Sequence, residues 1–187
     1  MNETMEALKW LDAEYGGFSD LPDSVYFVTL NVQNSKVHTF ESGTKYRLGW
    51  QVTHGDYARR EIGDFLQWRR TNKDGTANDE FTTFARRQVA SIIKAAQAAS
   101  GSDTLGAEAI TMLRHSTSVE TDMAGLRQLA QELAGIRIPI RLVSTSKKEK
   151  NDAGEEVVIA TYQNVRYLDK GKPIEATDPA ELAAVRV

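Results

Sequence analysis

Cationic and aromatic side chains are interleaved along the stretch from Lys45 to Arg70. Lysine and arginine neutralise phosphate groups and flat rings stack on bases, so the two residue types side by side suit the binding of single-stranded nucleic acid. The cations in question are Lys45, Arg47, Arg59, Arg60, Arg69 and Arg70, and the rings are Phe65 and Trp68. We therefore expect a nucleic-acid-binding face on this segment.

A second group of the same kind follows later in the chain. Arg141, Lys147 and Lys148 would line a neighbouring loop, and Tyr162 would add a further ring. These residues extend the predicted binding face beyond the first segment.

The charge distribution agrees with this interpretation, although the net charge of the chain is −3. Residues 1–23 carry one Lys or Arg against six Asp or Glu, whereas residues 36–87 carry ten against seven and residues 136–150 carry five against one. Residues 151–187 are acidic again, with four against seven. Because a local basic patch is the usual sign of nucleic-acid binding, the uneven distribution favours this function.

Three β-strands are predicted to position the first group. Apolar residues recur with period two at 25–32 and 45–52, and a third strand is expected at 59–70 after a turn at His54-Gly55-Asp56. A polar loop is expected at 34–43. Alternation along the second strand directs one set of side chains to the core and the other to the ligand.

The two faces of these strands are predicted to differ in function. Tyr46, Leu48 and Trp50 share the core face, while Lys45 and Arg47 share the opposite face. Phe65 and Trp68 are three positions apart on one strand, so one of them should be buried and the other exposed. The sequence does not say which.

Helices interrupt the strands between about 78 and 135. The strongest has Phe81, Phe84, Val89, Ile92, Ile93 and Ala96 on one face. A weaker helix is expected at 104–114, and a third is expected to begin at a cap within Ser116–Ser118 and to stop at Gly135. Two strands should follow, at 136–142 and 157–167, separated by a charged loop at 144–156.

The predicted fold is mainly β with inserted helices. Three strands, a helix and two strands are the order of the oligonucleotide-binding (OB) fold, a five-stranded Greek-key barrel. A rolled α+β sheet is the alternative. We expect a single domain over 1–187, with a barrel at about 24–168, a helical insertion at about 78–135, an acidic segment at 1–23 and a flexible tail at 169–187.

Three short motifs resemble a phage-encoded family once catalogued as of unknown function. They are Tyr15-Gly16-Gly17-Phe18 with Leu21-Pro22 and Tyr26, Asn72 in a loop before Arg86-Arg87, and Tyr162-Gln163-Asn164-Val165. The resemblance spans about 15–168. It implies non-catalytic binding of single-stranded DNA with little sequence preference during phage replication or recombination.

The same resemblance bears on partners and location. It implies single-stranded DNA and replication or recombination proteins as partners, in the host cytoplasm. Many single-strand binders recruit partners through an acidic tail closed by an aromatic residue, and Pro179–Val187 lacks that pattern. Recruitment through such a tail is not expected.

Other functions are less well supported by the residues. The chain contains no cysteine, its three histidines lie far apart, and no phosphate-binding Gly-rich motif or paired nucleophile and base is present. We expect no catalytic residue, metal or cofactor, and no apolar run is long enough to span a membrane. Two alternatives remain open, a protein-interaction module that docks through the acidic segment and the inserted helices, and a nuclease with metal-binding Asp56, Glu61 and Asp64.

Overall fold

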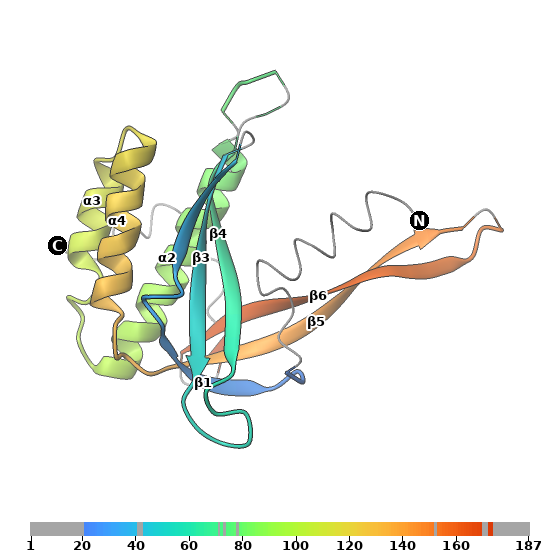
Figure 1. Ribbon diagram of the computed structural model, residues 1–187, viewed down its shortest axis with the longest axis horizontal. Helices are drawn as coiled ribbons and strands as arrows, with labels where there is room; N and C mark the ends of the chain where they lie inside the picture. Colours follow the sequence, from blue (N-terminus) through green and yellow to red (C-terminus); the bar gives the residue numbers. More distant parts are fainter. Residues whose placement is uncertain are drawn as a thin grey trace.

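The computed structural model describes residues 21–40, 43–70, 72, 74–77, 79–151, 153–169 and 172–173. Within these ranges the chain is mainly β, with three helices between two groups of strands (Figure 1). This confirms the predicted mainly β class with helices. Residues 1–20 of the acidic segment 1–23 and most of the tail 169–187 lie outside the described residues, as does most of the first resembling motif.

The first group of strands forms an antiparallel meander. β1 (Val25–Leu30) and β2 (Lys36–Phe40) both pair with β3 (Gly43–Val52). β1 pairs with the C-terminal end of β3 and β2 with its N-terminal half. A turn begins at Asn31, whose carbonyl accepts hydrogen bonds from the Asn34 and Ser35 amides. β1 and β2 thus lie along the same side of β3 as two halves of one bent strand. The loop predicted at 34–43 is wrong for most of its length.

The second group forms a long hairpin joined to the first through β1. β4 (Glu61–Arg70) completes the first group and pairs with the side of β3 opposite β1 and β2. The second group begins with β5 (Ile138–Lys150), which pairs with the start of β1. β6 (Glu156–Asp169) pairs with β5 along nearly its full length, and the two-residue β7 (Lys172–Pro173) adds to the end of β6. The sheet order is β2-β3-β1-β5-β6-β7, with β4 beside β3.

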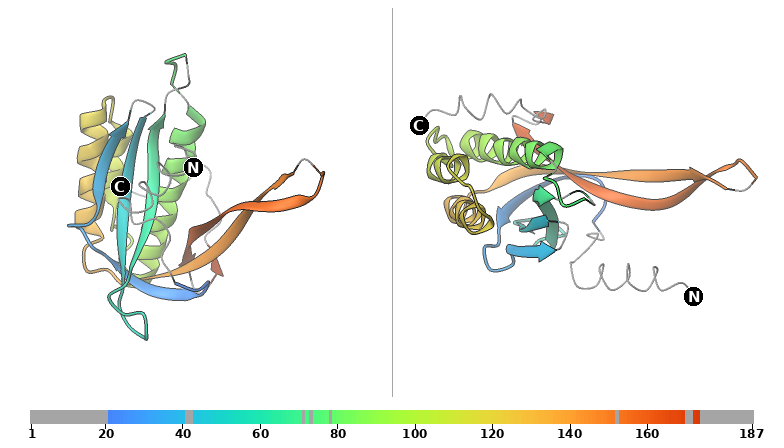
Figure 2. Two further views of the ribbon diagram at one scale, coloured as in Figure 1. Left: turned by 45° about the vertical axis from the view of Figure 1, so that its right-hand side comes forward. Right: turned by 90° about the horizontal axis from the view of Figure 1, so that it is seen from above.

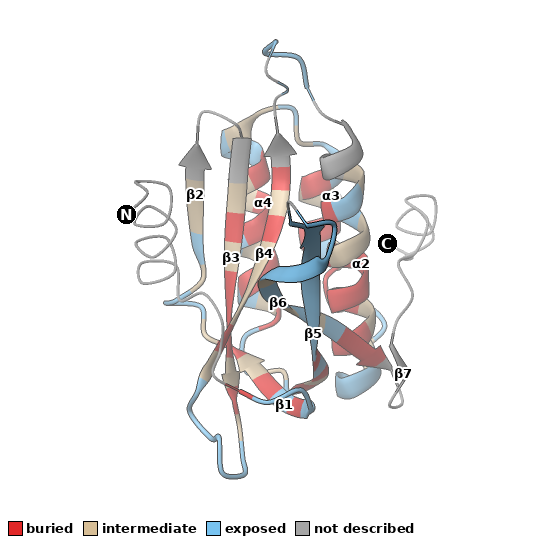
Figure 3. Ribbon diagram, turned by 90° about the vertical axis from the view of Figure 1, so that its right-hand side faces the viewer, coloured by how far each residue is buried: buried red, intermediate tan, exposed pale blue. Residues whose placement is uncertain are grey.

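The hairpin of β5 and β6 extends well beyond the body of the molecule (Figures 1 and 2). We call its outer part, residues 143–162, the arm. Side chains of β5 from Val143 to Lys150 are all exposed, and Figure 3 shows this part of the hairpin in pale blue. The charged loop predicted at 144–156 is therefore wrong, because a ribbon that buries nothing has no alternation of apolar and polar residues to reveal it.

The sheet is open rather than a closed five-stranded barrel. Among the described residues no backbone ladder joins β4 to β6, although both strands pack against the same helix. The predicted five-stranded Greek-key barrel is not confirmed, because the described strands form one open sheet. We call the space between β4 and β6 beside that helix the seam.

The helix at the seam, α2 (Asp79–Ser100), covers the inner face of the sheet. Its buried Val89, Ile92 and Ile93 meet the fully buried Trp50 and Leu48 of β3 in one core. Burial of such side chains is the main source of folding free energy, so α2 and β3 hold the two layers together. No helix in the described part of the chain is long and apolar enough to cross a membrane.

Two further helices complete the layer beside α2. α3 (Ala107–Arg114) and α4 (Val119–Glu132) pack against each other, and α4 begins with a capping box formed by Ser118 and Thr121. The predicted cap within Ser116–Ser118 is confirmed. The Glu132 carboxylate accepts hydrogen bonds from the amides of Gly106 and Ala109, so the end of α4 caps the start of α3.

Gly106 is required by the backbone at this point. Its φ is +86°, in the left-handed region, and an added Cβ would lie 2.9 Å from the fully buried side chain of Ile93. Gly106→Ala should lower the free energy of unfolding by about 2–5 kcal/mol, since left-handed strain and overpacking add. Urea denaturation measures this loss.

Gly101 provides the matched control. Its φ is +71°, but nothing lies within 4 Å of an added Cβ. Gly101→Ala should therefore cost only the backbone strain, about 1–2 kcal/mol. Equal losses for the two variants would contradict the packing argument.

Candidate nucleic-acid interface

The outer face of β3 and β4 contains part of the predicted interface. Tyr46, Leu48 and Trp50 are buried and Lys45 and Arg47 point to the other side, as the alternation predicted. This division of β3 into a core face and a polar face is confirmed.

Arg47 has partners within the protein. Its guanidinium forms an ion pair with Glu61 and donates a hydrogen bond to the Asn34 carbonyl, and its side chain is only 13% exposed. These contacts tie β3 to β4 and to the turn after β1. Arg47 therefore stabilises the outer face more than it presents a charge to solvent.

The structure resolves the choice between Phe65 and Trp68. Trp68 is buried, with 3% of its surface exposed, whereas Phe65 is half-buried on the outer face directly across from Arg47. The prediction of Trp68 as a stacking residue is wrong, because a ring in the core cannot lie against a base. Phe65 keeps an outward position.

The arginine pairs lie at opposite ends of β4. Arg59 and Arg60 are exposed in the loop between β3 and β4, and Arg59 adopts a φ of +71°. Arg69 and Arg70 end β4, and their side chains lie outside the described residues. The pairs thus do not form one cluster on the strand.

Most of the second predicted group lies on the hairpin. Arg141 is directly across from Arg166 in the register of β5 and β6, and Tyr162 is across from Thr145. All of these side chains are exposed. Lys147 and Lys148 form solvent-exposed ion pairs with Glu149 and Glu156, and such pairs contribute little to stability, so these cations stay accessible to a ligand.

The sequence did not predict a stack at the base of this hairpin. The Arg137 guanidinium lies 4.8 Å from the centre of the Phe27 ring, and the His54 ring lies 5.3 Å from it. Arg137 Nη2 is also 3.1 Å from His54 Nδ1. The period-two pattern puts Phe27 on the strand face opposite the core residue Val28. It does not reveal that Phe27 contacts Arg137 and His54, because residues so far apart in the sequence leave no local signal.

One continuous surface joins this stack to the hairpin. We call it the basic–aromatic face and define it by Phe27, Arg137, Arg141, Tyr162 and Arg166, all exposed. Strand register places Val25 across from Arg141 and Arg141 across from Arg166, so β1, β5 and β6 contribute to one side of the sheet. On that side of the sheet, between Val25 on β1 and Tyr162 on β6, every second residue of each strand faces outward, and none of these residues is acidic.

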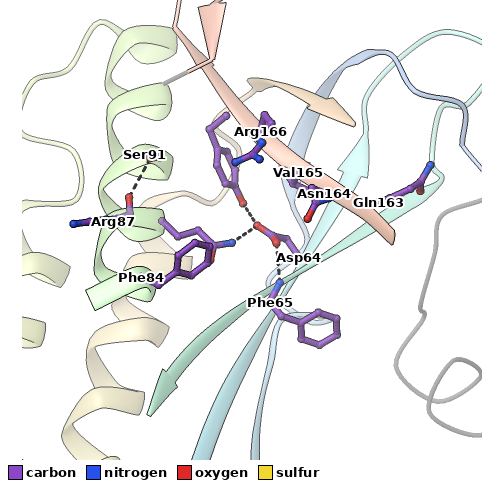
Figure 4. A pocket seen from close by; sticks show the side chains of 11 residues that line it. Asp64, Phe65, Phe84, Arg87, Ser91, Gln163, Asn164, Val165 and Arg166 are labelled. Atoms are coloured by element: carbon purple, nitrogen blue, oxygen red, sulfur yellow. Dashed lines mark hydrogen bonds between the residues drawn. The ribbon is translucent and has the colours of Figure 1, made fainter. Parts of the chain in front are cut away.

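A buried hydrogen-bond network bridges the seam (Figure 4). Trp50 Nε1 donates to the Tyr167 hydroxyl, which donates to Asp64 Oδ2 at 2.5 Å. Gln88 Nε2 of α2 donates to the same oxygen at 2.7 Å, and the Phe65 amide donates to Oδ1. Side chains thus join β4, β6 and α2 where a closed barrel would have a backbone ladder.

The electrostatics of this network are those of a carboxylate taken out of water. Burial raises the pKa of Asp64 above its usual value of 3.8, although its three donors act in the opposite direction. Burial and the nearby Asp64 carboxylate raise the pKa of Tyr167 well above its usual value. Asp64 therefore has a structural role.

The carboxylates considered for a metal site are not brought together. Glu61 pairs with Arg47 and Asp64 accepts the seam hydrogen bonds, while Asp56 is in the loop between β3 and β4. Within the described ranges, no group of three or more His, Cys, Asp or Glu side chains is placed to hold a metal ion.

Comparisons with known proteins return no match. No family model, no curated protein and no solved structure is significantly similar to the chain.

The raised pKa of Asp64 predicts a pH dependence of stability. The folded state binds the proton more tightly than the unfolded state, so the contribution of Asp64 to the free energy of unfolding is largest below pH 3.8 and decreases as pH rises through the folded pKa. In urea denaturation at several pH values, Asp64→Asn should remove this decrease. Its stability should fall less, or rise more, than that of the wild type between about pH 4 and pH 7.

Asp74 gives a control of opposite sign. Hydrogen bonds from Thr76 lower the pKa of this exposed carboxyl, so its contribution is present above pH 3.8 and is lost as pH falls. Asp74→Asn should therefore make the free energy of unfolding rise less as pH increases toward 3.8. If Asp64→Asn and the wild type have the same pH slope, the buried carboxylate is not the cause.

Proposed function

We propose that this chain is a non-catalytic protein that binds single-stranded DNA with little sequence preference through its basic–aromatic face. The observation that carries the proposal is the combination of exposed rings and arginines on one side of β1, β5 and β6. Phe27 and Tyr162 supply rings for stacking, and Arg141 and Arg166 supply paired charges in register. Such surfaces bind backbone and bases together without reading sequence.

The proposed interface keeps Arg141 and Tyr162 of the predicted residues, has others beside it, and is centred on the hairpin rather than on β3 and β4. Arg141, Lys147, Lys148 and Tyr162 lie on it or on the adjoining arm, and Arg59 and Arg60 lie on the loop next to His54. Lys45 and Phe65 lie further along the same curved sheet, on its outer face. The strand of DNA would follow the hairpin rather than the meander.

Strand pairing supports an opened relative of the OB fold. If β1 and β2 count as one bent strand, it pairs with β3 and with β5, β3 pairs with β4, and β5 pairs with β6. These neighbours are those expected of that barrel except at the seam. The setting in phage replication or recombination follows from the sequence resemblance.

A protein-interaction module is the second candidate, and the arm favours it. Val157, Val158 and Ile159 are consecutive exposed residues near its tip, with 39%, 57% and 47% of their surface exposed. Exposed apolar patches are a common mark of protein contacts. This candidate gains support if DNA binding is not observed.

A titration of labelled oligo(dT) tests the proposal. Anisotropy should report binding that weakens steeply as salt rises, because each neutralised phosphate releases counterions. No binding at low salt would exclude the proposal. Loss of oligonucleotide on adding magnesium would instead indicate a nuclease.

The paired arginines predict a specific change in salt dependence. Replacing both Arg141 and Arg166 with alanine should reduce the slope of log affinity against log salt by about 1.4, at about 0.7 per phosphate contact on a single strand. The melting temperature should hardly change, since both side chains are exposed. Arg127→Ala, at an exposed position of α4, should leave the slope unaltered.

A further inference from the structure

The seam contains a pocket that borders the basic–aromatic face, and Arg166 belongs to both. It has a volume of about 220 Å³ and lies between α2, β4 and β6 (Figure 4). Phe84, Gln88 and Arg87 line it from α2, Asp64 from β4, and Asn164 and Arg166 from β6. This volume is below the roughly 300–1,000 Å³ of sites for drug-sized ligands, so it suits a single ring system.

The inner end of this pocket has polar atoms that lack partners. Gln88 Nε2 donates to Asp64, but Gln88 Oε1 is buried and accepts no hydrogen bond from the described residues. Arg87 Nε is buried without a partner in the same way. A buried acceptor left unpaired is destabilising, and a ligand that brings an N–H group would satisfy it.

The outer end of the pocket has an exposed ring. Phe84 is 60% exposed, whereas Ala85, Val89 and Ile92 of the same helix are buried in the core. The ligand that this arrangement suits is flat enough to stack on a ring and carries an N–H donor on its edge. Every nucleobase meets both conditions, because each has a π-face and a donor on its Watson–Crick edge.

The pocket also adjoins the proposed path of the DNA. Asn164 and Arg166 line it. They lie on the same side of β6 as Tyr162, which is the side that contains the basic–aromatic face. A base that turns over the edge of β6 would therefore enter the seam while its phosphates stay near Arg166.

We propose that the seam pocket receives one nucleobase of the bound single strand, stacked on Phe84 and hydrogen-bonded to Gln88 Oε1. The proposal rests on the proposed function and adds a base-binding site to it. All four bases satisfy the site, so it adds affinity and fixes the register of the strand without selecting sequence.

The test compares Phe84→Ala with the wild type on two ligands. One is oligo(dT), and the other is an abasic strand of the same length that keeps the phosphates and lacks the bases. Loss of one stacked base should weaken oligo(dT) binding by about 5- to 100-fold, while binding of the abasic strand should be unchanged. Phe84→Trp should restore oligo(dT) binding.

Val32→Ala is the matched control, since Val32 is 39% exposed in the turn after β1, outside the basic–aromatic face and the arm, and is not among the residues that line the pocket. It should bind both strands like the wild type. Ultraviolet cross-linking of bound oligo(dT), mapped by mass spectrometry, should also label Phe84.

The outcomes separate the two proposals. If wild-type protein fails to bind oligo(dT), the proposed function and the base site both fail. If it binds and Phe84→Ala binds equally well, or is weakened equally on both strands, the base site is excluded and the proposed function stands.

Discussion

The buried carboxylate of Asp64 is the point on which the two halves of this structure depend. It accepts hydrogen bonds from Tyr167 of β6, from Gln88 of α2 and from the backbone of its own strand. A buried carboxylate is tolerated only when donors surround it, so β4, β6 and α2 must keep their spacing. The geometry of the hairpin relative to the meander is therefore set by one polar cluster within an apolar core.

This arrangement explains how the sheet is open and still fixed in shape. Among the described strands, backbone pairing connects the meander to the hairpin through β1 alone, by its antiparallel ladders to β3 and β5. A single shared strand leaves a twisted sheet free to flex, and the Trp50–Tyr167–Asp64 chain of hydrogen bonds restrains it at the opposite side. The pocket lies beside this chain because side chains bridge the seam less densely than a ladder would.

Much of the body of the fold could be predicted from sequence, and the reasons are local. Alternation at Tyr46, Leu48 and Trp50 and the helical spacing of Val89, Ile92 and Ile93 reflect burial on one face, which composition reveals directly. The arm was missed because its described residues bury little, and β2 was missed because Lys36 is exposed and Val37 and His38 are only partly buried. The seam was missed because Asp64 and Tyr167 are 103 residues apart and a lone carboxylate in a strand is usually solvated. The candidate interface was only partly predicted for the same reason, since Phe27, His54 and Arg137 meet only in the folded chain.

Under the proposed function, the arm carries part of the binding surface while the body of the protein carries the stability. Its side chains contribute almost nothing to the core, so substitutions along it are nearly neutral for folding, as surface changes generally are. Sequence there can diverge freely without loss of the folded state, and ligand preference can change while the body of the protein stays the same. The arm is thus the part of this molecule best suited to the evolution or engineering of new binding properties.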